Sequence, residues 1–342
     1  MAQTWPILVF SLGNWYISGV AAPADSCPDV SIVIVSFNTR DLLRDCLSSI
    51  HAACAGRTSE TFVVDNQSHD GSADMVAEEF PWVRLIRTER NLGFAGGNNC
   101  AFRLATGRFV YCLNPDTVSH PGSISFLLDI LERDPRIGYV GPKLLNADGT
   151  HQLSAYRFHT VLSGLFSWSM LGFDRRFPKS RHCLSLHHQY GYDTAIDVDW
   201  ITGAAIMTRA QVVADIGGYN EAYFLYAEEI EWCWRMHRAG WIGRYEPGAV
   251  VTHIRAASTS HLSDSHAFHG HNPALLIESH RRLARQTLGR PGQALSTALH
   301  LLGLSAAFLR NVPPMPRRNA STRRKAFLWI KYLLRTPVRK SA

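Results

Sequence analysis

The sequence predicts an α/β fold, in which helices flank a wound, mostly parallel sheet and a basic helical extension follows at the C-terminal end. Two patterns lead to this prediction: apolar runs of strand length alternate with stretches at helical spacing, and polar residues follow these runs. The composition, with 46% hydrophobic and 18% charged residues, is that of an ordinary globular protein. A chain of 342 residues can form one large α/β domain with extra elements, or two modest domains.

The first predicted strand is the run Val30–Phe37, which is apolar and rich in β-branched residues, as buried parallel strands are. After a polar turn, apolar residues at helical spacing predict an amphipathic helix. The alternation continues with strands predicted over 61–64, 83–86 and 109–113 and helices over 73–80 and 97–106.

Polar residues stand where each of these strands ends. They are Asn38, Asp65, Asn91 and the sequence Asn114-Pro115-Asp116. In wound sheets, ligands bind at the carboxyl ends of the strands. The sequence therefore predicts a ligand site at this edge of the sheet.

The second half of the chain is less regular. Residues 157–192 are rich in aromatics and histidine with weak periodicity, which indicates an insertion or a flexible loop. Core patterns return over 198–208, in a loop that enters a helix over 222–239, and in a last strand over 248–253. Helices are predicted over 274–289 and 294–310. The apolar segment 326–334 is too short to span a bilayer and has the composition of a helix that lies on a membrane surface.

Charge is unevenly distributed along the chain. Residues 281–342 contain fourteen Lys or Arg and no Asp or Glu, so the net charge of +7 leaves 7 − 14 = −7 for the rest. A basic tail of this kind favours an anionic partner, such as a membrane surface. The seven cysteines form no C-x-x-C pair, which argues against a zinc site and favours a reduced, cytosolic protein. Residues 1–28 have no basic residue and a broken apolar run, so we expect neither a signal peptide nor a membrane span there.

Two segments suggest contacts to a nucleotide. In residues 63–71, the carboxylate of Asp65 can accept a hydrogen bond from a base or a ribose, with Asn66 and Asp70 beside it; the alternative is a turn that caps the next helix. In residues 89–99, glycines and asparagines permit close approach of a ligand near a helix N-terminus, and the alternative is a tight connection. The candidate residues of this second segment are Asn91, Gly93 and Asn98.

Acidic residues occur in two further places. Asn114 and Asp116 follow a strand, and Asp116 can bind a divalent cation that bridges diphosphate oxygens. Glu228 and Glu229 stand among aromatic residues, which can raise a carboxylate pKa towards that of a general base. The alternative for the glutamates is a solvated helix start. His253, at the end of the last strand, is either a metal ligand or a structural residue.

The order of these segments resembles that of the family 2 inverting glycosyltransferases, particularly their bacterial rhamnosyltransferase-like branch. The resemblance covers about residues 30–260 and is specific as a joint pattern. The segments that carry it are VSIVIVSFN at 30–38, VVDNQSHDGS at 63–72, ERNLGFAGGNN at 89–99, LNPDT at 113–117, DWITGAAIMTRA at 199–210, IGGYNEAYFLYAEEIEWCWRMHRAGW at 216–241 and EPGAVVTH at 246–253.

The resemblance implies a GT-A fold, a nucleoside-diphosphate sugar donor and a divalent metal, Mg²⁺ or Mn²⁺. Asp65 would face the base, with Asn38 and Asn91 near the nucleoside, and Asp116 with His253 would hold the metal. Glu229 would be the catalytic base, paired with Glu228. The expected divisions are an N-terminal extension over 1–28, a GT-A domain over 29–260 (nucleotide-binding half about 29–118, acceptor half about 119–260) and a basic helical region over 261–342.

The expected reaction is transfer of a sugar, with dTDP-L-rhamnose as the best guess for the donor, to a glycan or polyprenyl-diphosphate-linked acceptor in cell-surface polysaccharide synthesis. The expected location is the cytoplasm, at the inner face of the plasma membrane, with no nucleic acid as partner. The sequence departs from the family pattern Glu-Asp-x-Asp, because it has Glu228-Glu229-Ile230-Glu231. A degenerate domain that binds without turnover is therefore the alternative. A nucleotidyltransferase would need a basic glycine-rich loop after the first strand, where this chain has Ser36-Phe37-Asn38-Thr39.

Overall fold

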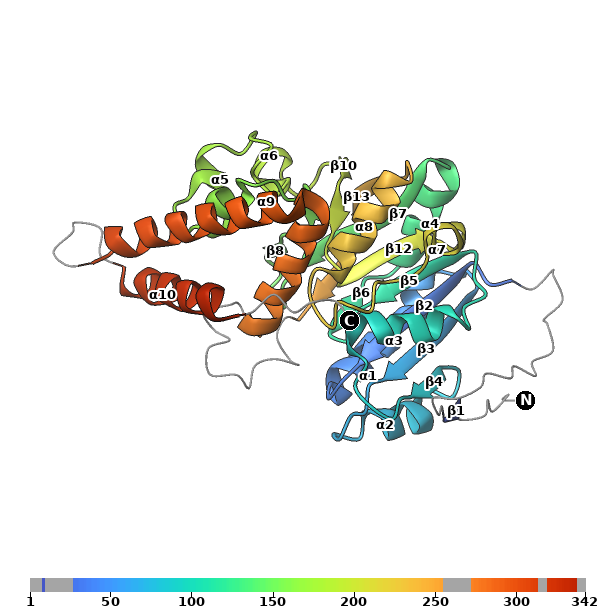
Figure 1. Ribbon diagram of the computed structural model, residues 1–342. Helices are drawn as coiled ribbons and strands as arrows, with labels where there is room; N and C mark the ends of the chain where they lie inside the picture. Colours follow the sequence, from blue (N-terminus) through green and yellow to red (C-terminus); the bar gives the residue numbers. More distant parts are fainter. Residues whose placement is uncertain (1–7, 10–26, 255–271, 313–318, 337–342) are drawn as a thin grey trace.

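The computed structural model describes residues 8–9, 27–254, 272–312 and 319–336, and it has a mixed sheet with helices on both faces (Figure 1). The main sheet of this described part has the order β1-β4-β3-β2-β5-β12-β7-β13-β10. Apart from β1 (Leu8–Val9), the expected extension over 1–28 falls almost entirely outside the described residues, as does the expected boundary near residue 260.

The first half of the chain forms the parallel part of the sheet, as the alternation predicts. Strands β2, β3, β4 and β5 pair in parallel, and β1 adds to the edge beside β4. The elements are β2 (Val30–Ser36), α1 (Arg40–Cys54), β3 (Ser59–Asp65), α2 (Ser72–Glu79), β4 (Arg84–Arg87), α3 (Gly93–Phe102) and β5 (Phe109–Leu113).

The second half completes the sheet with mixed pairing. Strand β12 runs antiparallel to both β5 and β7, while β13 runs parallel to β7 and antiparallel to β6. The elements are β6 (Thr117–Ser119), α4 (Ser123–Arg133), β7 (Ile137–Leu145), β8 (His151–Gln152), β9 (Ala155–Tyr156), β10 (Ile196–Val198), β11 (Trp200–Ile201), β12 (Ala205–Arg209), α7 (Ala210–Ile216), α8 (Glu228–Arg238) and β13 (Ile242–His253).

The core has two layers, one on each face of the sheet. Ile32 and Ile34 of β2 pack with α1, α2 and α4, whereas Val33 and Val35 pack with α3 and α8. Successive side chains of a strand point to opposite faces, and both faces are covered here. This explains why β2 is apolar at consecutive positions rather than at alternate ones.

Helix α3 and strand β13 begin several residues earlier than the sequence predicts. Helix α3 begins at Gly93 instead of residue 97, since Asn91 Oδ1 accepts a hydrogen bond from the Gly93 N–H over 2.8 Å and starts the helix there. Strand β13 begins at Ile242 instead of Gly248. Its register shifts between Glu246 and Val250, which lets the strand accommodate Pro247 and Gly248 within its length.

The stretch 157–192, for which we expect an insertion or a loop, contains three short helical segments. They are the π-helical turn η2 (Gly164–Trp168), α5 (Phe173–Arg176) and α6 (His187–Tyr190). The turn η2 packs on α9 (Pro273–Arg310), which is followed by α10 (Ala320–Arg335). The outer half of α9 (residues 291–310) lies beside α10, and both project away from the sheet (Figure 1).

Helix α9 joins the two helices predicted over 274–289 and 294–310. It bends at Gly289, whose φ of 72° and ψ of 175° are not helical, and Pro291 follows. At its N-terminus the Asn272 side chain accepts hydrogen bonds from the N–H groups of Ala274 and Leu275. By length and composition alone, α9 could cross a membrane.

Candidate active site

Asp65 occupies the carboxyl end of β3 and is 4% exposed. Its Oδ2 accepts a hydrogen bond from the Ser68 N–H over 3.1 Å, whereas its buried Oδ1 has no hydrogen-bond partner among the described residues. Leaving a buried carboxylate oxygen without a donor costs free energy. This oxygen can therefore accept a hydrogen bond from a ligand, as expected for a residue that faces a nucleoside.

Asn38 and Asp70 connect the two loops that follow β2 and β3. Asn38 has a φ of 53°, and its Oδ1 accepts a hydrogen bond from the His69 N–H over 2.8 Å. The Asp70 carboxylate accepts from the N–H groups of Arg40 and Ser72. Burial raises the pKa of Asp70, but hydrogen bonds from Ser72 and Arg40 outweigh it and hold the pKa below its ordinary value. Asp70 therefore binds backbone N–H groups at the starts of α1 and α2, as the helix-capping alternative predicts.

Polar residues of both predicted nucleotide segments make hydrogen bonds at the start of α3. Asn66 Nδ2 donates to the Gly93 carbonyl over 2.9 Å, and Asn98 Nδ2 donates to the Phe94 carbonyl over 2.9 Å. Asn98 is fully buried, and its Oδ1 has no partner in the described part of the chain. Asn66, Asn91 and Gly93 therefore hold the start of α3 in place, while Oδ1 of Asn98 retains a free acceptor.

Asp116 and His253 meet because β6 pairs with β13, which sets Thr117 opposite His253. The Nε2 atom of His253 lies 3.3 Å from Asp116 Oδ1 and 3.4 Å from Asn114 Nδ2. Its Nδ1 lies 2.7 Å from Gln152 Oε1, whose amide nitrogen in turn donates to Asn146 Oδ1. This network assigns the imidazole proton to Nδ1 and leaves the lone pair of Nε2 beside the carboxylate.

An imidazole lone pair and a carboxylate oxygen at this separation fit a divalent cation. The Gln152 contact is of the kind that orients a metal-binding histidine. Among the described residues, no group of three or more His, Cys, Asp or Glu side chains surrounds a possible metal position. The remaining ligands would have to come from the substrate or from water. Sequence reasoning missed Gln152, since no motif marks it.

Glu228 and Glu229 begin α8 directly after a turn in which Tyr226 and Ala227 have φ values of 71° and 65°. Each glutamate has a buried Oε2 without a hydrogen-bond partner in the described ranges. Burial raises the pKa of Glu229 to about 7. Burial, and then the charge of Glu229, hold the pKa of Glu228 well above its ordinary value. At neutral pH the pair therefore retains a proton and can accept one.

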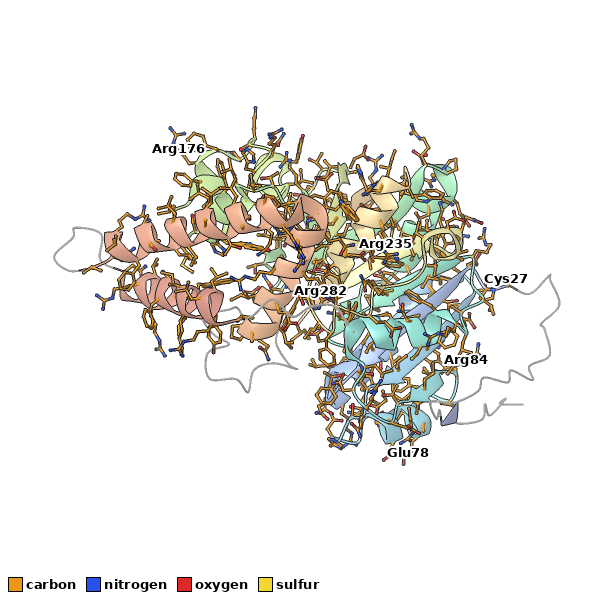
Figure 2. All side chains as sticks on the ribbon, viewed as in Figure 1. Cys27, Glu78, Arg84, Arg176, Arg235 and Arg282 are labelled. Carbon is orange, nitrogen blue, oxygen red and sulfur yellow. The ribbon has the colours of Figure 1, made fainter. Side chains whose placement is uncertain are left out.

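Glu231, the third acid of this segment, has a different environment. It is 1% exposed, and both of its carboxylate oxygens lie 3.0 Å from Arg235 Nε. Arg235 extends from α8 (Figure 2) and also donates to the carbonyls of Ile216 and Gly218. Glu231 therefore stabilises the fold around α8.

The turn between β11 and β12 lies between the metal candidates and the glutamates. Its Ala204 carbonyl accepts a hydrogen bond from the Asn114 N–H over 2.9 Å. A side chain on Gly203 would contact Cβ and Cγ of Glu229 at 3.4 and 3.6 Å. The structure thus brings Asn114, Asp116 and His253 together and connects them through this turn to Glu229.

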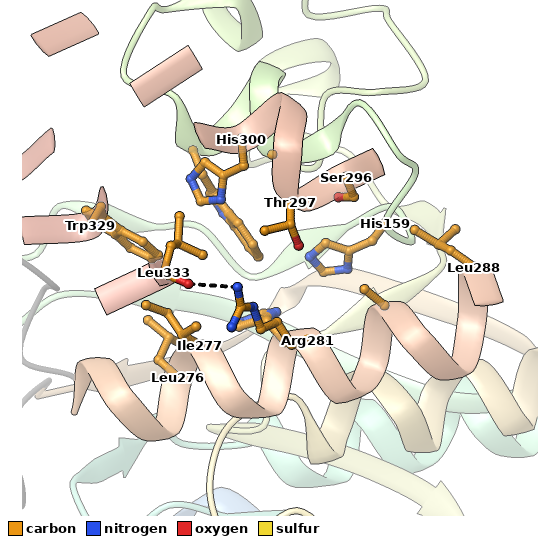
Figure 3. Close-up of a pocket in the computed structure, with 14 residues that line it drawn as sticks. His159, Leu276, Ile277, Arg281, Leu288, Ser296, Thr297, His300, Trp329 and Leu333 are labelled. Atoms are coloured by element: carbon orange, nitrogen blue, oxygen red, sulfur yellow. Dashed lines mark hydrogen bonds between the residues drawn. The ribbon is translucent and has the colours of Figure 1, made fainter. Parts of the chain in front are cut away.

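A cavity lies elsewhere, between α9, α10 and η2 (Figure 3). Trp168, His300 and Trp329 are among its lining residues, and Arg281 donates to the Leu333 carbonyl across it over 2.7 Å. None of the site residues predicted from the sequence lines this cavity.

Comparison with known proteins gives consistent results. Residues 31–191 match the family described as "Glycosyl transferase family 2". An N-acetylglucosaminyl-diphospho-decaprenol L-rhamnosyltransferase of Mycobacterium tuberculosis is 29% identical over 69% of this chain and 80% of its own length. The low-salt glycan biosynthesis hexosyltransferase Agl10 of Haloferax volcanii is 27% identical over 61% of this chain and 62% of its own.

Solved structures support the fold. The mannosyltransferase PcManGT from Pyrobaculum calidifontis, in complex with GDP-Man and Mn²⁺, superposes with a TM-score of 0.52. It is 16% identical, over 92% of this chain and 87% of its own. GalNAc-T7 with UDP, GalNAc and Mn²⁺ gives a TM-score of 0.53 at 14% identity, over 91% of this chain and 56% of its own.

Proposed function

The chain belongs to glycosyltransferase family 2, has the GT-A fold and transfers a sugar from a nucleotide sugar, and we propose that the sugar is L-rhamnose. The proposed reaction is transfer from a nucleoside-diphosphate sugar, with dTDP-L-rhamnose as the first candidate, to a hydroxyl group of the acceptor with inversion. The choice of rhamnose is supported by the mycobacterial relative, whose name specifies an L-rhamnosyltransferase. We also propose the division of the chain into a GT-A domain over 29–260 and a basic helical region over 261–342.

The observation that carries the mechanism is the environment of Glu229. Its Oε2 is buried without a partner among the described residues, and burial raises its pKa to about 7. A base with a pKa near the working pH accepts a proton most effectively. Glu229 would take the proton of the acceptor hydroxyl while the hydroxyl oxygen attacks the anomeric carbon. The bond to the nucleoside diphosphate breaks on the opposite face of the sugar, which gives inversion.

The donor would be bound by the loops after β2, β3 and β5. Asp65 Oδ1 would accept a hydrogen bond from the nucleobase or the ribose, with Asn38 and Asn91 on the neighbouring loops. Asp116 and His253 Nε2 would hold Mg²⁺ or Mn²⁺, and an imidazole ligand favours Mn²⁺. Such an ion would neutralise the charge of the departing diphosphate.

We propose a lipid-linked acceptor, because the mycobacterial relative is named for a decaprenol-diphosphate-linked substrate. A protein that uses such an acceptor must work at a membrane. The proposed location is the cytoplasmic face, with residues 281–342 in contact with the bilayer. Fourteen basic and no acidic residues in this range favour an anionic lipid surface.

The outer half of α9 and α10, which we call the arm (residues 291–310 and 320–335), carries an exposed apolar face. On α9 the exposed positions Ala294, Leu295, Ala298, Leu302, Ala306 and Leu309 recur at helical spacing. Leu302 is 63% exposed, and Leu334 on α10 is 69% exposed. On α10 the exposed residues include the charged Arg324 and the apolar Phe327 and Leu334. A helix surface with both kinds of side chain suits the boundary between lipid headgroups and acyl chains.

The arm is a better candidate for lying on the membrane than for spanning it. The bend at Gly289 interrupts α9, and the opposite face of its outer half packs against η2 and α10. Buried His300 and Asn311 also belong to this part of the chain. A helix that spans a bilayer would need apolar surface on all sides or a partner within the membrane.

The experiment that tests the function is donor binding and transfer with the purified full-length protein. Calorimetry with a panel of nucleotide sugars, with Mn²⁺ and then with chelator, should show metal-dependent binding of dTDP-L-rhamnose. Transfer to a polyprenyl-diphosphate-linked N-acetylglucosamine should follow. Tighter binding and turnover of a different sugar nucleotide would replace rhamnose. Binding without transfer or hydrolysis would favour a degenerate domain that binds without turnover. The argument for that alternative is that Glu229 stands where the family pattern has Asp.

A further inference from the structure

The turn before α8 needs support from its surroundings. Tyr226 and Ala227 both have φ values in the left-handed region, 71° and 65°, and neither is glycine. Such a conformation is strained for a residue with a side chain and persists only where neighbouring groups hold it. Because Glu228 and Glu229 follow directly, the position of the proposed base depends on this turn.

One side of the turn is held by α3. The Phe94 N–H donates to the Phe224 carbonyl over 2.9 Å. A Cβ atom at Gly93 would lie 2.2 Å from the same carbonyl oxygen, so the contact requires glycine there. This explains one glycine of the segment 89–99 without any ligand.

The other side is held by the inner half of α9. Ser279 Oγ donates to the Leu225 carbonyl over 2.9 Å, and the Asn272 N–H donates to the Tyr226 hydroxyl over 3.1 Å. Gln286, two helical turns after Ser279, makes a bridge. Its Oε1 lies 3.0 Å from the Tyr223 hydroxyl, which donates to it, and its Nε2 donates to Glu231 Oε1 over 2.8 Å.

The two residues that Gln286 joins stand on either side of the catalytic pair in the sequence. Tyr223 precedes the strained turn, and Glu231 follows the glutamates within the first turn of α8. Glu231 is a buried carboxylate that Arg235 also binds, so its bond with the Gln286 amide is charge-assisted. Bonds of this kind are stronger than those between two neutral groups on a surface.

We propose that Gln286 is a positioning residue for the sugar-transfer reaction, since it fixes the segment 223–231 in the shape that places Glu229 at the acceptor. The inference rests on the proposed role of Glu229 as the base. It adds α9 to the catalytic apparatus, although α9 lies beyond residues 31–191 that match the family. It also connects that apparatus to the arm, because Gln286 stands just before the bend at Gly289.

The test compares Gln286→Ala with the wild-type full-length protein. We expect kcat to fall about 10-fold to 100-fold, since small displacements of a catalytic group cost that much. The donor KM should stay within about twofold, because the donor contacts lie on other loops. Hydrogen exchange of the amides of 224–229 should become faster. Gln286→Glu, which sets a second carboxylate against Glu231, should lower kcat at least as far.

The control is Gln211→Ala, which removes the same side chain from the exposed surface of α7 and should change none of these quantities. An unchanged kcat in Gln286→Ala would overturn the proposal, whether or not exchange becomes faster. An equal loss in Gln211→Ala would also overturn it. If the wild-type protein transfers no sugar from any donor, the proposed function fails instead. Amide exchange then decides by itself whether Gln286 fixes the segment.

Discussion

The Nε2 atom of His253 lies 3.3 Å from Oδ1 of Asp116, and both side chains are largely buried. With its proton on Nδ1, held by Gln152, the imidazole presents a lone pair to a carboxylate. Two acceptors that face one another in this way repel unless a proton or a metal ion lies between them. A metal ion held by both atoms would remove this repulsion, as a shared proton would, and the proposed metal position requires such a pair.

Replacement of Asp116 by alanine should remove metal-dependent turnover. We expect a loss of 100-fold or more in kcat, because the charge on the departing diphosphate would no longer be neutralised. Gln152→Ala should weaken Mn²⁺ affinity by about 10-fold, as loss of a residue that orients a metal ligand does. Mn²⁺ titration of activity measures both effects. Wild-type transfer by Asp116→Ala at ordinary Mn²⁺ concentrations would refute the assignment.

The pH dependence of the reaction should report Glu229. Since the base must be ionised and its pKa lies at about 7, kcat/KM should rise through pH 7 and level off above it. Glu229→Gln should lower kcat by about 10²–10⁴-fold. Glu221→Gln, which removes an exposed carboxylate from the preceding loop, is the control and should retain most of the activity. A flat profile between pH 5 and 9 would show that another group is the base.

The same carboxylate should lower stability at alkaline pH. Its pKa in the folded protein is raised above the unfolded value, so folding takes up a proton between about pH 4.5 and 7. Stability is then highest below this window and falls as the pH rises through it. Glu229→Gln should therefore raise the free energy of unfolding at pH 8 by about 1–2 kcal/mol and change it little at pH 4.5. Urea unfolding at the two pH values measures this difference.

Donor affinity should depend on Asp65. Asp65→Ala should raise the dissociation constant for the nucleoside diphosphate about 10-fold to 100-fold, the effect of losing one hydrogen bond to a charged group. Asp74→Asn removes an exposed carboxylate on the neighbouring helix and serves as the matched control. Calorimetry with the nucleoside diphosphate gives both constants. Equal affinity in wild type and Asp65→Ala would show that Asp65 does not contact the nucleobase or the ribose of the donor.

Binding of the arm to membranes should require its apolar face. A double variant, Leu302→Glu and Leu309→Glu, should reduce flotation with anionic vesicles about 10-fold or more, because each charge would have to enter the interface. Ser48→Glu on α1 adds one such charge far from the arm and should float as the wild type does. Flotation of the wild type should also weaken at high salt. Undiminished flotation of the double variant would exclude this face as the contact.

Local patterns in the sequence predict the wound sheet well. The consecutive apolar residues of β2 indicate burial on both faces, and the limits predicted for β5 are those of the structure. The sequence predicts that α3 begins at residue 97, but it begins at Gly93. There the Gly93 N–H donates to the Asn91 side chain, a contact that periodicity does not indicate. Asp65 and Asp116 were found because they follow strands. Asp70 stands in the polar loop after the same strand as Asp65, but its carboxylate accepts hydrogen bonds from the backbone at the starts of α1 and α2.

Long-range contacts could not be predicted in the same way. The approach of His253 to Asp116 depends on the register between β6 and β13, which no local pattern specifies. Gln286 has no motif, and its two partners belong to a segment far from it in the sequence. The family pattern identifies Glu229, but only the fold shows that Glu231 is used by Arg235 and Gln286.

The bend at Gly289 fixes the direction in which the apolar face of the arm points relative to the inner half of α9. An added residue in a helix rotates everything beyond it by about 100°. One alanine inserted between Gln286 and Gly289 would leave the Gln286 bridge in place but move the outer half out of register with η2, on which it packs. Such an enzyme would keep the segment around its proposed base, yet its apolar face would no longer be held at a fixed angle to the rest of the protein.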